Sequence, residues 1–188
     1  MALRTIAELL TGIGTLALAG TAVVGGWFRW RFFERTTLTL LERDGVPGEL
    51  GLYDQGHPSM LYHFKVTNQH PTRPAKKCRV MLVALEKRYG ENEFQPAPMA
   101  VPRQFMWAPS EDELRGVTVT TPNMVDFGRV DPHRNAFDPS IRKPPRNFQG
   151  SVGKDEAVRF HIRVEAENFV SPQPNVFQVS WDGTWDED

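Results

Sequence analysis

The chain has 188 residues, with 22 basic and 23 acidic side chains and a formal net charge of -1. This balance argues against general nucleic-acid binding, which depends on a basic surface, so we expect no nucleic-acid partner. Cys78 is the only cysteine, which excludes an intrachain disulfide.

After a short tail at residues 1–8, residues 9–28 contain no charged side chain. About twenty helical residues, each rising about 1.5 Å, cover the hydrocarbon core of a bilayer. The sequence therefore predicts one N-terminal transmembrane helix and the lipid bilayer as a partner. The alternative is a signal peptide cleaved after Ala19, but Glu8 interrupts its apolar region and apolar residues continue beyond the cut.

Small residues recur within this segment at spacings of three and four, which places them on one face of a helix. Close approach through small residues is a main source of helix association in lipid. This favours a protein partner or self-association through the helix, while the alternative is a chance pattern in a segment rich in glycine and alanine. The predicted packing face consists of Gly12, Thr15, Ala19, Ala22 and Gly26.

Residues 29–36 follow the predicted helix as a juxtamembrane belt of aromatic and basic side chains. Basic residues tend to stay in the cytoplasm and aromatic rings settle at the headgroup level. We expect a single-pass protein of the bacterial inner membrane, with its C-terminal domain in the cytoplasm. Arginines that only snorkel would carry no message about topology, and the alternative is a C-terminal domain that lies outside. The belt is formed by Arg29, Trp30, Arg31 and Arg35, together with Trp27 at the end of the predicted helix.

Residues 37–188 are predicted to form one all-β domain. All fifteen prolines stand at Pro47 or later, which disfavours long helices. Alternation is cleanest where Val158, Phe160 and Ile162 share one side of a strand. We expect an immunoglobulin-like antiparallel β-sandwich, with a partly open barrel as the alternative. Seven strands are predicted, at residues 37–41, 49–53, 60–67, 78–85, 117–121, 157–164 and 176–181.

The third and fourth predicted strands are joined by a turn-rich segment and are expected to pack as neighbours. The run from Leu61 to Leu85 reads LYHFKVTNQHPTRPAKKCRVMLVAL. A strand ending in Val-x-Asn leads through a loop to an Ala-x-x-Cys strand, which resembles the opening of adhesion-related immunoglobulin-like modules of bacteria and archaea. The resemblance implies a domain that binds or spaces and rarely catalyses. It carries over no functional residue.

Two groups of residues are weighed as metal ligands. His63 and His161 lie on the polar sides of their strands and could meet to bind a metal, although exposed strand histidines are the simpler interpretation. Asp126, Asp131 and Asp138 stand in a loop-rich stretch that could wrap calcium, but turn-forming aspartates explain it without a metal. We expect no metal and no cofactor.

Catalytic motifs are weak throughout the chain. No serine stands in a Gly-x-Ser-x-Gly turn, and Cys78 falls on the predicted buried side of its strand. The acidic run from Glu111 to Glu113 is typical of a solvated loop. We therefore expect that the protein is not an enzyme.

Two proline-rich stretches, residues 95–110 and 139–148, are predicted to form a recognition loop. The rings would anchor a partner, and the basic residues would contact anionic headgroups or a partner, unless they are merely solvated. The predicted function is a membrane-anchored interaction or assembly module. The alternative is an envelope-facing ligand-binding or hydrolytic domain that depends on a glycan or a metal. The predicted recognition residues are Phe105, Trp107, Arg142, Lys143 and Arg146.

Overall fold

The structure is a computed structural model that describes residues 38–42, 49–53, 57–70, 73–89, 93–99, 101–108, 116–131, 133–167 and 169–184. Among these residues, no helix has the length and apolarity needed to cross a membrane. The predicted helix at residues 9–28, its small-residue face and the belt at residues 29–36 lie outside the described residues.

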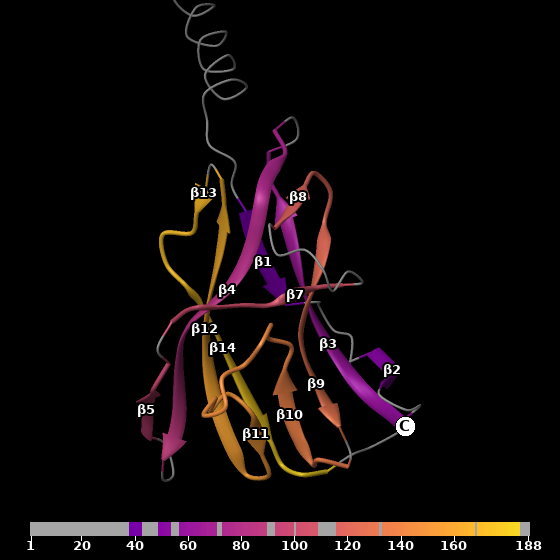
Figure 1. Ribbon diagram of the computed structural model, residues 1–188, viewed down its shortest axis with the longest axis vertical. Helices are drawn as coiled ribbons and strands as arrows, with labels where there is room; N and C mark the ends of the chain where they lie inside the picture. Colours follow the sequence, from indigo (N-terminus) through magenta and orange to yellow (C-terminus); the bar gives the residue numbers. More distant parts are fainter. Residues whose placement is uncertain are drawn as a thin grey trace, which may run out of the picture. The chain divides into compact units, whose positions relative to one another are not determined.

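The described residues form an all-β domain of two antiparallel sheets (Figure 1). The first sheet has the order β1-β3-β9-β10-β11, with β2 also pairing with β3 and β7 with β9. Its strands are β1 (Leu38–Glu42), β2 (Glu49–Tyr53), β3 (His57–Asn68), β7 (Met106–Trp107), β9 (Asn123–Asp131), β10 (Ala136–Pro139) and β11 (Val152–Gly153).

The second sheet is built around two long central strands that pair antiparallel with each other, β4 and β12. Its order is β13-β12-β4-β5, with β14 also pairing with β12 and both β6 and β8 with β4. Its strands are β4 (Ala75–Tyr89), β5 (Glu93–Ala97), β6 (Arg103–Gln104), β8 (Val117–Val119), β12 (Glu156–Ala166), β13 (Phe169–Val170) and β14 (Asn175–Trp181).

All seven predicted strands overlap strands of the structure, and the all-β, two-sheet prediction is confirmed. Two predictions differ from the fold. The stretch read as loop-rich around Asp126 and Asp138 forms the antiparallel pair β9 and β10. The third and fourth predicted strands lie in opposite sheets, because β3 pairs with β1, β2 and β9 while β4 pairs with β12.

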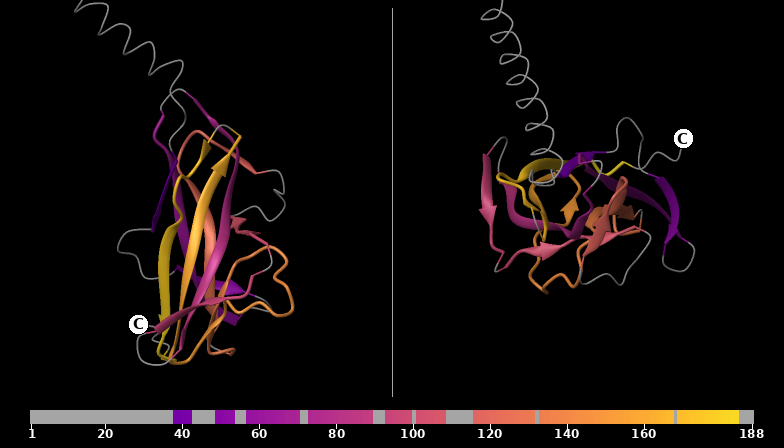
Figure 2. Two further views of the ribbon diagram at one scale, coloured as in Figure 1. Left: turned by 90° about the vertical axis from the view of Figure 1, so that its left-hand side faces the viewer. Right: turned by 90° about the horizontal axis from the view of Figure 1, so that it is seen from above.

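One short segment connects the two sheets by crossing from one to the other. β6 pairs with β4 of the second sheet, and β7, two residues later, pairs with β9 of the first. Between them, the backbone N–H of Phe105 donates to the carbonyl of Val80 at 2.9 Å, and its ring is buried. The segment runs across the long strands in Figure 1, and the view from above shows the two sheets enclosing the core (Figure 2).

Aromatic rings fill the space between the sheets, with Phe127 of β9 at their centre. Its ring centroid lies 4.3 Å from that of Phe64 of β3 and 5.3 Å from that of Phe160 of β12. The Phe127–Phe160 pair joins the two sheets, and rings at such separations attract one another beyond their area of burial. The other rings around Phe127 belong to Phe105, Phe137 and Phe177.

Replacing Phe127 by alanine is expected to lower the free energy of unfolding of the β domain by about 3–5 kcal/mol, because five ring contacts are lost and a cavity remains. The measurement is urea unfolding of the full chain in detergent, followed by circular dichroism. Phe94→Ala is the control, since this half-exposed ring lies under the Arg159 guanidinium at 3.8 Å and should cost about 1 kcal/mol. Equal losses would contradict the central role of Phe127.

Candidate ligand-binding site

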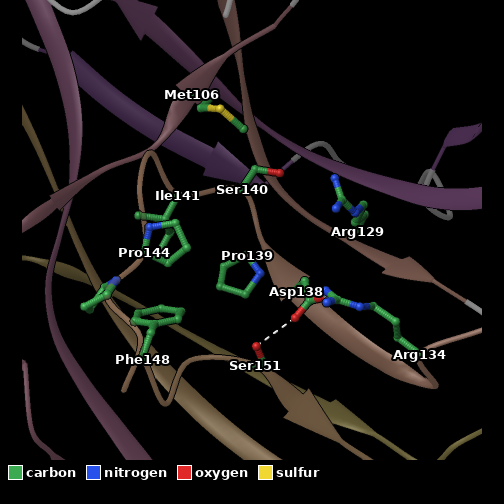
Figure 3. A pocket seen from close by; sticks show the side chains of 11 residues that line it. Met106, Arg129, Arg134, Asp138, Pro139, Ser140, Ile141, Pro144, Phe148 and Ser151 are labelled. Carbon is green, nitrogen blue, oxygen red and sulfur yellow. Dashed lines mark hydrogen bonds and ion pairs between the residues drawn. The ribbon is translucent and has the colours of Figure 1, made fainter. Parts of the chain in front are cut away.

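A pocket of about 390 Å³ lies where β7, β9 and β10 meet the segment 140–151 (Figure 3). Figure 3 shows apolar side chains along one wall and charged side chains along the other. The pocket is lined by Met106, Arg129, Arg134, Asp138, Pro139, Ser140, Ile141, Pro144, Pro145, Phe148 and Ser151.

Backbone hydrogen bonds fix the start of the segment 140–151 to the crossing strand. The N–H of Ser140 donates to the carbonyl of Phe127 at 2.9 Å, and the N–H of Met106 donates to the carbonyl of Ser140 at 3.1 Å. The N–H of Arg142 donates to the carbonyl of Gln104 at 3.0 Å. The pocket wall is therefore held by the same backbone network that joins the two sheets.

Asp138 ties the charged wall together. One carboxylate oxygen lies 2.7 Å from Nη1 of Arg134, and the other accepts a 2.7 Å hydrogen bond from the hydroxyl of Ser151. The Asp138 side chain is 21% exposed and that of Arg134 is 64% exposed. Arg129 stands directly opposite Asp138 in the register of β9 and β10. The carboxylate therefore holds the pocket together, while the Arg134 guanidinium reaches the solvent at its rim.

The apolar wall depends on a close contact between Phe148 and Gly150. A side-chain carbon at position 150 would lie 2.2 Å from the Phe148 ring, which is closer than real atoms approach. Upstream, the N–H of Phe148 donates to the carbonyl of Pro145 at 3.0 Å and closes a turn. The missing side chain at Gly150 thus leaves room for the Phe148 ring.

The predicted recognition residues separate into two groups. Phe105 and Trp107 are 1% and 4% exposed and pack in the core, so their rings are not on the surface. Arg142 is half-buried, and Lys143 and Arg146 are exposed on the segment whose Ile141, Pro144, Pro145 and Phe148 line the pocket. None of the five predicted residues lines the pocket: the two rings lie in the core, and the three basic residues are sequence neighbours of lining residues. Lys143 has a φ of 48°, a left-handed conformation uncommon for a residue with a side chain.

The two histidines weighed as metal ligands lie on opposite sheets and do not meet. His63 of β3 lies 2.8 Å from Asp126 of β9, and His161 of β12 lies 3.2 Å from Glu86 of β4. Within the described ranges, no group of three or more histidine, cysteine, aspartate or glutamate residues could hold a metal ion. The prediction that Asp126 and Asp138 lie in one loop-rich stretch that could wrap calcium is wrong, because they belong to paired strands.

Cys78 is fully buried, as its position in the strand predicts. Burial raises the pKa of its thiol to about 11, although a backbone hydrogen bond at Val119 acts in the opposite direction. Its Sγ lies 3.4 Å from the carbonyl oxygen of Ala75. A buried, protonated thiol of this kind packs as a small apolar group.

Seven of the eleven lining residues fall in the two stretches predicted as a recognition loop, but the individual residues predicted there are not among them. Arg129, Arg134 and Asp138 stand in the stretch predicted as loop-rich, and Met106 lies between Phe105 and Trp107, the two rings predicted as anchors. One available signal was the alternation of Val125 and Phe127 with polar neighbours, which is typical of a strand with one buried side.

Comparisons of the chain with protein-family models, with curated proteins and with solved structures give no match. What the structure itself defines is an all-β domain of two antiparallel sheets with a pocket on one of them.

Replacing Gly150 by alanine is expected to displace the Phe148 ring and to open the apolar wall, because the added carbon overlaps the ring. We expect a loss of about 1–3 kcal/mol in the free energy of unfolding, the usual cost of overpacking. Urea unfolding measures the loss. Gly153→Ala is the matched control, since its nearest neighbour would be the Glu156 carboxylate at 3.4 Å. If both variants unfold like the wild type, the Phe148–Gly150 contact does not hold the wall.

Proposed function

We propose that this protein is a membrane-anchored, non-catalytic interaction module, a protein-binding or scaffold subunit whose β domain holds a partner at the bilayer. The observation that carries the proposal is the pocket on the first sheet. Its walls come from β strands and from a segment tied to them by backbone hydrogen bonds, so the concave surface exists before any ligand arrives. Rigid sites of this kind lose little entropy on binding.

The chemistry of the pocket supports binding over turnover. Its one carboxylate, Asp138, is already engaged by Arg134 and Ser151 at 2.7 Å each. The remaining lining includes three prolines, a methionine, an isoleucine and a phenylalanine, which offer contact area and no reactive group. Apolar walls with a few placed polar groups are typical of recognition sites.

The anchor and its orientation belong to the same proposal. Residues 9–28 would form the membrane helix, with Gly12 and Gly26 at the ends of a face that joins a partner helix or a second copy. The arginines of residues 29–36 favour the cytoplasmic side of a bacterial inner membrane for the β domain. The alternation and proline spacing that led us to expect an immunoglobulin-like sandwich support that finer description of the two-sheet domain.

Topology is tested with a membrane-impermeant maleimide on intact cells that express Gln173→Cys. Gln173 is exposed in the turn before β14, and the buried thiol of Cys78 makes the wild type the blank. We expect labelling only after the membrane is opened. Labelling of intact cells would put the β domain outside and favour an envelope ligand-binding or hydrolytic role instead.

The interaction role is tested by photo-crosslinking in membranes with benzoylphenylalanine at Asn147, an exposed neighbour of Phe148 in the pocket segment. We expect a discrete adduct that disappears when Phe148→Asp places a charge in the apolar wall. The same photoprobe at Gln173 is the control and should give no adduct. Equal adducts at both positions, or an adduct that survives Phe148→Asp, would contradict a pocket-centred interaction.

A further inference from the structure

Basic side chains outnumber acidic ones in the pocket lining and on the segment 140–151. The segment 140–151 carries Arg142, Lys143 and Arg146 and no acidic residue. Within the pocket itself, Arg129 and Arg134 stand against one carboxylate, that of Asp138. Asp138 also accepts from Ser151, so it would not face an incoming anion as a bare charge. The rim therefore favours a negatively charged ligand.

The opposite wall is apolar and fixed. Ile141 is 5% exposed and its segment forms a bridge with the crossing strand at Phe105. Pro144 and Pro145 restrict the backbone beside it, and Phe148 lies against Gly150. This wall contributes favourable binding free energy only when an apolar group of the ligand packs against it.

The size of the pocket limits what this group can be. A volume of about 390 Å³ lies near the lower end of the range of small-ligand pockets. It can accept one aliphatic or aromatic side chain together with neighbouring peptide groups. A flat surface of anionic lipid headgroups could satisfy the basic rim but would leave the apolar wall unfilled.

We infer that the pocket binds an acidic peptide segment of a partner protein that presents one apolar side chain. The apolar side chain lies against Met106, Ile141 and Phe148, while the flanking carboxylates contact the basic residues of the rim. This inference rests on the proposed interaction function and names the chemistry of its partner. Both halves of the ligand are needed, because the two walls of the pocket differ in character (Figure 3).

The test uses the full chain in nanodiscs of zwitterionic lipid and three fluorescein-labelled peptides. The first is Asp-Glu-Leu-Glu-Asp, the second is its amide analogue Asn-Gln-Leu-Gln-Asn, and the third is Asp-Glu-Gly-Glu-Asp, which lacks the apolar side chain. Fluorescence anisotropy measures the affinity of each. We expect the first peptide to bind at least about tenfold more tightly than either of the others.

Two double variants locate the charge effect. Lys143→Gln with Arg146→Gln removes two exposed rim charges and should weaken the first peptide about tenfold, with a smaller dependence on salt. Lys65→Gln with Lys76→Gln removes two exposed charges elsewhere and should leave its affinity unchanged. Phe148→Ala should reduce the preference for leucine over glycine, and circular dichroism checks that each variant is folded.

Several outcomes would overturn the inference. These are equal binding of the acidic and amide peptides, equal losses in both double variants, or no peptide binding while vesicles with 30% phosphatidylserine bind through Lys143 and Arg146. Each of these outcomes would reject an acidic peptide as the ligand, even when the photo-crosslinked adduct at Asn147 is observed. Loss of that adduct's dependence on Phe148 would instead reject the proposed function itself.

Discussion

The packing of Phe127 against five other rings is the constraint on which the domain depends. The ring of Phe127 touches partners from both sheets and from the crossing strand, so the two layers cannot separate without exposing the cluster. The Phe137 ring fills the space beside the neighbouring Gly128. A side-chain carbon at position 128 would lie 2.3 Å from Cζ of Phe137. The cluster therefore fixes the pairing of β9 with β10 and, through it, the backbone beneath the pocket.

The pocket inherits its geometry from this core through the alternation of β strands. In β9, Val130 is buried on the inner side, and its neighbour Arg129 lines the pocket. In β10, Phe137 joins the ring cluster while Asp138 accepts from Arg134 and Ser151. Because successive side chains point to opposite faces, packing inside positions the charges outside. A one-residue change of register would exchange the two sets.

Alternation allowed the long strands to be predicted from the sequence, because one side of each is apolar and the other polar. The strand β12 is the clearest case, with Phe160 and Ile162 fully buried and His161 between them partly exposed. β9 was missed because its aspartates and Gly128 are also typical of turns. The pocket itself was beyond reach, since it joins residues from Met106 to Ser151 whose proximity depends on which sheet each short strand enters.

The short segment that crosses between the sheets differs from the prediction in where its two rings lie. The sequence singled out Phe105 and Trp107 as surface anchors because large rings in a proline-rich stretch resemble contact residues. Both rings instead fill the core, and Met106 between them lines the pocket. The same burial also orients the basic cluster, since the bridge from Phe105 to Ile141 fixes the start of the segment that carries Lys143 and Arg146. The rings thus act through the fold, by holding the start of the segment whose residues line the pocket.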